Sequence, residues 1–433
     1  MAVLTTSQIK YSKKSAFSWC LYDWANTAFG TVIITFIYGV YFSKSLVGDE
    51  IEGSALWGYA IAGSGVAIAL LAPFLGAVAD HAGSRKKWIA FFSALCIVAT
   101  SLLWFSENPD GSKNIVLILI LVAIANLGLE LGQVFYNAML PNIAPPHMKG
   151  RLSGWAWALG YMGGLASLVV CLFVFVGLGD IAPIFELSKE KNEHIRIVGP
   201  FIALWFLVFM LPLFLFVKDQ AADEEALPSA VRDGWKQLID SFHHIKEFKS
   251  LFLFLIASAI YRDGLVTLFA LGGVYAAGQF GMNFTEILIF AIGLNVAAGL
   301  GAFGFAFLDD AIGSKKTIIY SLVGLIVVGG IILLTSDKYV FIGLSMVLGI
   351  FMGPVQAASR TMVARLSPPH ILTQAYGFYA FTGKSISFLG PLSFGLATTA
   401  FATQQAGMAT IVLFWVVGFV MLWWVKEKDL SNA

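Results

Sequence analysis

Charged residues are scarce in this sequence: Asp, Glu, Lys and Arg make up 12% of its 433 residues, whereas 58% are hydrophobic. Soluble globular domains carry about 25% charged residues, and the mean hydropathy of this chain is +0.81. A soluble domain of this length is therefore excluded. Because apolar runs of helical length dominate, we expect an all-α polytopic membrane protein.

Several residue types that carry chemistry are also rare or badly placed. Cys20, Cys96 and Cys171 lie inside apolar runs without CxxC spacing, so we expect neither a disulfide nor a metal site. Most basic residues lie in loops and the net charge is +1, so the sequence gives no case for a nucleic-acid-binding patch. No Walker A pattern is present, so ATP is not the direct energy source. No histidine falls inside an apolar segment, so we expect no enzyme and no cofactor.

Twelve apolar segments are long enough to cross the membrane, because a hydrocarbon core of ~30 Å needs about 20 helical residues. The first six cover residues 16–43, 55–79, 88–106, 115–139, 151–177 and 197–217. The second six cover residues 250–278, 284–308, 316–335, 339–363, 374–396 and 405–425. The prediction is an N-terminal six-helix half at 1–217, a linker at 218–249 and a C-terminal six-helix half at 250–433.

One charged loop occurs in both halves, at an offset of 230 residues. Asp80, Gly83, Ser84 and Lys86 recur as Asp310, Gly313, Ser314 and Lys316, while Arg85 becomes Lys315 and Gly76 becomes Ala306. A carboxylate, a Gly that can take φ > 0 and several cations form a short hairpin between two membrane helices. Asp23, Thr27 and Phe29 also match Asp263, Thr267 and Phe269 at an offset of 240. The two halves are therefore predicted to be homologous.

The distribution of Lys and Arg predicts the orientation. One side carries Lys10, Lys13, Lys14, Arg85, Lys86, Lys87, Lys149, Arg151, Lys315, Lys316, Arg365, Lys426 and Lys428. The other side carries Lys44, Lys113, Lys189, Lys191, Arg196 and Lys338. The positive-inside rule then places the richer side, both termini and the linker in the cytoplasm.

The linker contains a second kind of helix. Its apolar residues Trp235, Leu238, Ile239, Phe242, Ile245 and Phe248 recur at helical spacing opposite charged ones. This pattern predicts an amphipathic helix at the cytoplasmic membrane surface. A passive connector is the preferred interpretation, and a regulatory element is the alternative.

Six charged residues fall inside the predicted spans, where each costs roughly 2.5–3.5 kcal/mol and needs a partner or a function. They are Asp23, Glu130, Arg262, Asp263, Arg360 and Lys384. In the span 115–139, Asn126, Glu130, Gln133 and Asn137 also lie on one helical face. Such a stripe is typical of a helix that lines a cavity, although hydrogen bonds between helices are the alternative for the amides.

These polar side chains form the predicted substrate site. Its members are Asp23, Asn26, Asn126, Glu130, Gln133, Arg262, Asp263, Gln356, Arg360 and Lys384. Arg360 and Lys384 are expected to hold a substrate carboxylate by charge-assisted hydrogen bonds. Proton coupling is assigned to Glu130, Asp23 and Asp263, with Glu130 preferred because a poorly solvated carboxyl group can be protonated near neutral pH. The alternative is that Glu130 stays ionised beside a basic partner.

The charged loop, with its Gly-x-x-x-Asp-x-x-Gly-x-Arg-Lys pattern, resembles the loop between helices 2 and 3 of the major facilitator superfamily. Residues Tyr22-Asp23-Trp24-Ala25-Asn26-Thr27-Ala28-Phe29 and Tyr136-Asn137-Ala138-Met139-Leu140-Pro141 are similar to the vacuolar-effluxer-like branch. Fungal members of that branch are linked to autophagy and export amino acids. The resemblance covers nearly the whole chain.

The resemblance implies a secondary transporter in which two halves rock about a midplane cavity. It also implies a cytoplasmic gate formed by the two loops, here Gly76, Asp80, Gly83, Arg85, Lys86, Asp310, Gly313 and Lys315. With the buried charges, it favours a proton-coupled carrier of an amino acid or short peptide. An exporter of amphipathic drugs or lipid-like molecules is the alternative. The partners expected are the substrate and the lipid bilayer, and we expect a monomer in a bacterial inner membrane.

Overall fold

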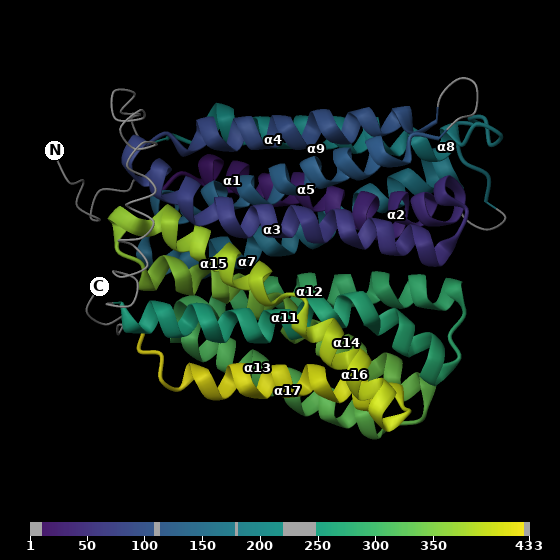
Figure 1. Ribbon diagram of the computed structural model, residues 1–433. Coiled ribbons are helices and arrows are strands. Elements are labelled where there is room, and N and C mark those ends of the chain that lie inside the picture. Colours follow the sequence, from purple (N-terminus) through teal and green to yellow (C-terminus); the bar gives the residue numbers. More distant parts are fainter. Residues whose placement is uncertain (1–10, 108–112, 178–180, 220–247, 428–433) are drawn as a thin grey trace.

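Long helices form two groups that are stacked on each other (Figure 1). The computed structural model describes residues 11–107, 113–177, 181–219 and 248–427. Helices from the first half of the chain, drawn in purple to teal, make one group, and the green to yellow helices of the second half make the other. The amphipathic helix predicted in the linker lies outside the described residues, apart from Phe248.

The first half is built from six membrane-spanning units. Along the chain its elements are α1 (Lys13–Ala28), η2 (Phe29–Phe36), α2 (Tyr38–Tyr41), η3 (Phe42–Val47), α3 (Glu50–Ala82), α4 (Arg85–Ser101), η4 (Leu102–Ser106), α5 (Ile115–Ala138), α6 (Leu140–Ile143), η5 (Pro146–Met148), α7 (Lys149–Cys171), η6 (Leu172–Val176), α8 (Glu193–Arg196) and α9 (Val198–Phe216). Its core is aromatic, with the Trp19 and Tyr136 rings stacked at 4.5 Å.

The second half repeats this arrangement. Its elements are α11 (Lys249–Phe280), α12 (Phe284–Ile312), α13 (Ser314–Leu334), α14 (Lys338–Leu366), η7 (Pro369–Ile371), α15 (Leu372–Ile386), α16 (Leu389–Phe401) and α17 (Gln404–Leu422). Trp415 and Tyr261 are among its fully buried side chains. The side chains on the lipid-facing surface are large and apolar, as a membrane requires.

The span predicted at 374–396 is divided into two helices. α15 ends at Ile386 and α16 begins at Leu389, so in the described chain eleven helices, and not twelve, are individually long and apolar enough to cross a membrane. Pro391 lies in the first turn of α16, where its missing N–H is tolerated, but it would interrupt a continuous helix. α15 and α16 together cover the span predicted at 374–396, with a break between Ile386 and Leu389.

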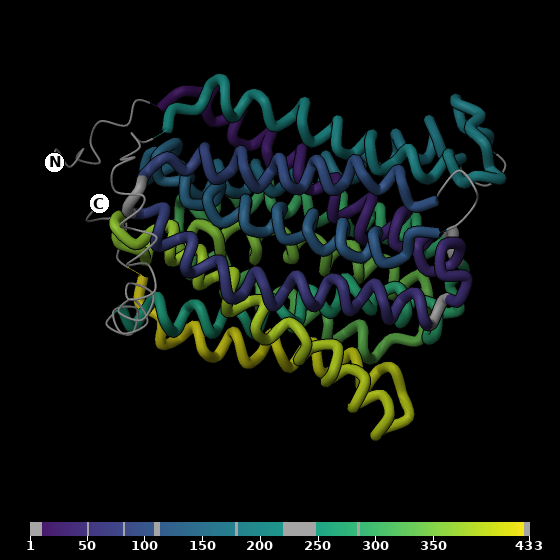
Figure 2. Tube along the Cα trace, turned by 45° about the horizontal axis from the view of Figure 1, so that its top comes forward, coloured from purple at the N-terminus to yellow at the C-terminus, as the bar shows by residue number. Residues whose placement is uncertain are grey.

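The two halves touch mainly through two helix pairs, α3 with α15 and α7 with α12. Figure 2 shows α16 diverging from the first half while α15 stays beside it. The tight contacts lie toward the end of the bundle that carries the Gly83–Ser84 and Gly313–Ser314 loops, which we call the basic end. The halves are therefore joined at the basic end.

Candidate functional site

The first charged loop binds the other half of the protein directly. Asp80 Oδ1 accepts a hydrogen bond from the Thr373 backbone N–H at 3.0 Å, and its Oδ2 accepts one from Gln374 at 2.9 Å. These donors belong to the first turn of α15, where a carboxylate is stabilised by unpaired N–H groups and the helix dipole. Arg85 supports the contact, because its Nε donates to Thr373 Oγ1 at 3.0 Å. The hydrogen bonds expected for Asp80 from the facing helix end are present.

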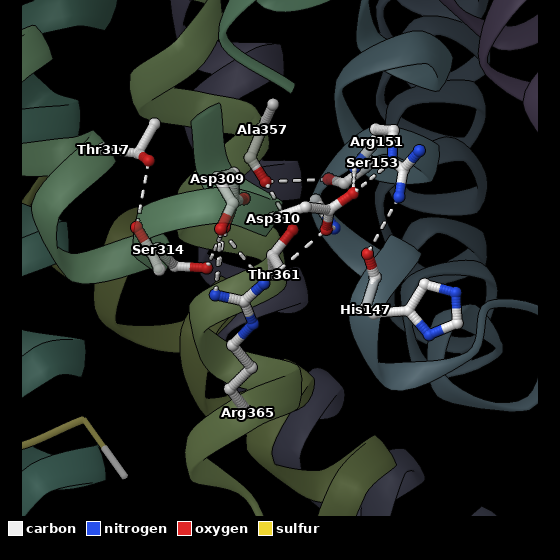
Figure 3. A network of polar contacts seen from close by, with 12 residues as sticks. His147, Arg151, Ser153, Asp309, Asp310, Ser314, Thr317, Ala357, Thr361 and Arg365 are labelled. Atoms are coloured by element: carbon white, nitrogen blue, oxygen red, sulfur yellow. Dashed lines mark hydrogen bonds and ion pairs between the residues drawn. The ribbon is translucent and has the colours of Figure 1, made fainter. Parts of the chain in front are cut away.

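The second loop makes the matching contact with α7 (Figure 3). Asp310 accepts from the backbone N–H groups of Gly150 at 2.8 Å and Arg151 at 3.1 Å, and from Arg151 Nε at 2.7 Å. Beside it, Arg365 lies 3.1 Å from Asp309. Each half therefore caps the start of a helix in the other half with a carboxylate. Arg151 and Arg365 were predicted from the sequence only as topology signals, but both bind carboxylates of this loop.

The loop lysines act within each half. Lys86 Nζ donates to the Phe214 and Val217 carbonyl oxygens at the end of α9, each at 2.7 Å. Lys315 Nζ donates in the same way to Val425 at 2.7 Å, at the end of α17. Glu427, which follows α17, also binds the second loop, because it accepts a hydrogen bond from the Lys315 backbone N–H at 2.9 Å. Each of these two lysines binds a helix end in its own half, so it stabilises its loop without joining the two halves.

Glycines allow the halves to approach closely at the basic end. A methyl group on Gly76 would lie 2.8 Å from Thr373 O, so only a hydrogen fits there. In the second copy Ala306 occupies the position equivalent to Gly76. There the glycine is on the facing helix, α7, because a methyl group on Gly154 would lie 2.4 Å from Ala306 Cβ. Gly83 and Gly313 have φ values of 68° and 92°, as the hairpin requires.

Two ion pairs cross between the halves farther from the basic end. Arg360 Nη1 donates to Asp23 Oδ2 at 2.8 Å. The same guanidinium donates to Ser153 Oγ at 2.9 Å, to Ser153 O at 2.7 Å and to Asn137 Oδ1 at 3.3 Å. Arg360 is only 3% exposed, so in this state its donors are occupied and enclosed by protein. The hydroxyl and carbonyl of Ser153 were not among the predicted site residues.

The second ion pair is more accessible. Lys384 Nζ donates to Glu130 Oε1 at 2.8 Å, and the side chains are 28% and 33% exposed. Arg262 binds the same helix as Lys384, because its guanidinium carbon lies 3.9 Å from the centre of the Tyr379 ring on α15. Glu130 thus has a basic partner, which its alternative interpretation requires, and its protonation state during transport stays a prediction.

Most other predicted site residues act between helices. Asn126 donates to Ser64 Oγ at 2.8 Å, and Gln356 donates to Tyr161 Oη at 2.9 Å across the two halves. Gln133 is half-buried. Asp263 accepts from the Gly390 N–H at 2.7 Å, at the start of α16.

A cavity of about 680 Å³ lies between the halves, away from the basic end. Its wall is largely apolar, with Leu268, Phe269, Phe290, Leu348 and Ile411 among the lining residues. Polar lining comes from Asn26, Thr27, Thr31, Thr35, Tyr275, Asn295, Ser345 and Trp415. Asn26 is thus the one member of the predicted substrate site among the residues lining this cavity in the described structure. Thr31 and Thr35 of η2 were not among the predicted substrate-site residues, although Thr31 lies on the same helical face as Asp23 and Asn26 in the sequence pattern.

The sequence of this chain matches a known protein family over most of its length. The family model described as vacuole effluxer Atg22 like matches residues 40–431. The chain belongs to this family. An Atg22-like protein is a transporter and not an enzyme, which agrees with the prediction from the sequence.

The relatives of this Atg22-like chain come from bacteria and fungi. It is 25% identical over 428 residues to the uncharacterized MFS-type transporter YxiO of Bacillus subtilis, with 98% of each chain covered. It is 23% identical over 366 residues to autophagy-related protein 22 of Saccharomyces cerevisiae, covering 73% of this chain and 66% of that protein.

Solved structures show the same fold. The major facilitator proton:xylose symporter XylE superposes with a TM-score of 0.72 at 14% identity, covering 96% of this chain and 95% of the other. An outward-facing bacterial homologue of the iron transporter ferroportin gives 0.69 at 15% identity, covering 94% and 98%. The predicted all-α major facilitator fold is therefore confirmed, and this Atg22-like protein is a secondary transporter embedded in a lipid bilayer.

Proposed function

We propose that this transporter carries a small zwitterionic solute, an amino acid or short peptide, in a proton-coupled cycle. The observation that supports it is the accessible cluster of Glu130, Lys384 and Arg262. Glu130 and Lys384 are each about a third exposed inside the bundle, and Arg262 adds a second cation that is stacked on Tyr379, on the helix that carries Lys384. A substrate carboxylate fits the surplus positive charge, and a substrate ammonium group fits Glu130.

From the sequence, Arg360 and Lys384 were both expected to bind the substrate carboxylate, but the two cations have different surroundings. Arg360 has Asp23, Ser153 and Asn137 on its donors and is buried. Lys384 has one carboxylate partner and is partly exposed. We assign the substrate carboxylate to Lys384 and Arg262, and we assign to Arg360 the task of joining the halves while the basic end is closed.

The gates supply the conformational cycle. With the basic end in the cytoplasm, Asp80 and Asp310 hold that side closed, and the cavity lies on the outer side. Opening inward requires both carboxylates to leave the helix starts of α15 and α7. A substrate that separates Glu130 from Lys384 removes one contact between the halves, which couples its binding to this opening.

The apolar cavity wall favours a second candidate, an exporter of amphipathic molecules. A space of about 680 Å³ surrounded by aromatic and aliphatic side chains suits a hydrophobic body with a polar end. On this hypothesis the charged cluster is structural. The same experiment separates the two functions.

The experiment uses purified protein in lipid vesicles, after a thermal-shift screen of amino acids, peptides, sugars and drugs. A ligand at 100 times its Kd adds about 2.7 kcal/mol to stability. Lys384→Gln and Arg262→Gln should each weaken counterflow of an amino acid at least tenfold while affecting its amide analogue much less. Lys338→Gln, which removes a lysine paired with Glu286 at the far end, is the control. Equal losses for acid and amide, or stabilisation by drugs alone, would contradict the proposal.

A further inference from the structure

A pair of buried oxygen atoms in the second half has no hydrogen-bond partner. They are Asp263 Oδ1 and Thr267 Oγ1, one helical turn apart on α11, and neither finds a partner among the described residues. The exposed fraction is 2% for Asp263 and 0% for Thr267. A buried carboxylate oxygen without a donor is costly, so its lack of a partner requires an explanation.

Both oxygens lie against Gly390, at the start of α16 and beside the break between α15 and α16. A methyl group built on Gly390 would lie 1.9 Å from Thr267 Oγ1 and 3.1 Å from Asp263 Oδ1. Thr267 Oγ1 therefore occupies the space that a side chain at position 390 would need, and Asp263 Oδ1 lies against the same glycine. Asp263 Oδ2 is already occupied by the Gly390 N–H, so Oδ1 is the acceptor that remains.

The duplication explains why Asp263 lacks a cation. Asp23 is its equivalent in the first half, and Asp23 pairs with Arg360. The residue equivalent to Arg360, at the offset of 223 that joins the later helices, is Asn137. The first half thus offers Asp263 no arginine, and the two acids have different charge environments although their helices are homologous.

The cations near Asp263 are engaged elsewhere. On the helices packed against α11, the charged groups near the middle of the bundle are Arg360 of α14 and Lys384 of α15, which bind Asp23 and Glu130. Arg262 of α11 stacks on Tyr379 of α15. α16 and α17 contain no titratable side chain. No described ion pair includes Asp263.

We propose that Asp263 carries the coupling proton of this transporter, held between Asp263 Oδ1 and Thr267 Oγ1. The proton comes from water, forms the O–H of a neutral carboxyl group, and is donated in a hydrogen bond to Thr267. A proton needs one further oxygen, whereas a metal cation such as Na⁺ needs several ligands, and among the described residues the unpartnered side-chain oxygens beside Gly390 are Asp263 Oδ1 and Thr267 Oγ1. Val266 and Ala270 of the same helix line the cavity, so water is close by. The proton leaves when the halves rock and water reaches the carboxylate.

This inference rests on the proposed coupled cycle, but its first test needs no substrate. Infrared spectra of the purified protein are compared at about pH 5 and about pH 9, on either side of neutral pH. We expect a buried carboxylic-acid band that Asp263→Asn removes and Glu130→Gln retains. Thr267→Val should shift this band because the O–H loses its acceptor, and Thr267→Ser should restore it. An unchanged band in folded Asp263→Asn protein would overturn the proposal.

A second arm separates the proton from sodium and from the transport hypothesis. Thermal stability is compared in sodium chloride and choline chloride, and we expect no sodium-specific stabilisation. A sodium effect that Asp263→Asn abolishes would overturn the proton assignment. In vesicles, Asp263→Asn should lose uphill uptake driven by a pH gradient while keeping counterflow. If no amino acid is transported, the proposed substrate fails while the infrared result still decides the proton site.

Discussion

At the scale of single residues, the burial of Arg360 sets its role. Four hydrogen bonds and the Trp19 ring, 4.9 Å from its guanidinium carbon, surround it. A guanidinium is the best suited cation for such a site because it has five donors in a fixed plane. Its position on one half and that of Asp23 on the other make this pair a contact that the protein must break during transport.

Removing the carboxylate of Asp23 should leave a buried, poorly compensated cation. Asp23→Asn is expected to destabilise the closed state by about 3–5 kcal/mol, and adding Arg360→Gln should recover part of the loss. Thermal unfolding in detergent measures both. Glu286→Gln at the outer surface is the control and should change little. A double variant no more stable than the single one would show that the ion pair is not the cause.

Asp80 offers a sharper test of gating. Both of its carboxylate oxygens accept backbone N–H groups, so Asp80→Asn places an NH₂ group against a donor. The variant should fold but transport poorly, because the basic end closes less well. Transport per folded molecule in vesicles gives the result. Normal transport by well-expressed protein would reduce the loop to a topology signal.

At the scale of helices, close packing of α7 on α12 depends on Gly154. An added methyl group would lie 2.4 Å from Ala306 Cβ and 2.5 Å from Ala302 O, so the helices must separate. Gly154→Ala should therefore shift the protein toward opening at the basic end, measured as a longer distance between spin labels on the two halves. Ala306→Gly should restore part of the closure.

The control for this helix pair is also on α12. A methyl on Gly304 would meet no atom within 4 Å, so Gly304→Ala should leave the label distance unchanged. If Gly154→Ala behaves like Gly304→Ala, the glycine contact is not what holds the gate closed.

At the scale of the whole molecule, orientation is the property that the packing alone does not define. The loop lysines and the residues that start α1 and α11 lie at the basic end, which the positive-inside rule assigns to the cytoplasm. We expect a fluorescent protein fused after residue 433 to fluoresce in bacterial cells. Alkaline phosphatase should be active when inserted between residues 107 and 113 and inactive at the C-terminus. The reverse pattern would invert the topology.

The sequence by itself determined the membrane fold, its duplication and the hairpin loops. These follow from local or repetitive signals: apolar length, the spacing of Asp80 and Gly83, and a second copy around Asp310. It also identified the six buried charges, because any charge inside an apolar span is conspicuous.

Only the tertiary structure decided the partners of those charges. Asp23 and Asp263 occupy equivalent sequence positions, yet one meets Arg360 and the other meets the start of α16. Periodicity along one helix gives a direction for a side chain, but it does not identify the residue that this side chain faces on a helix 127 or 337 positions away. The break between α15 and α16 was also decided by the tertiary structure. Pro391 permits it, but the carboxylate of Asp263, on α11, caps the start of α16.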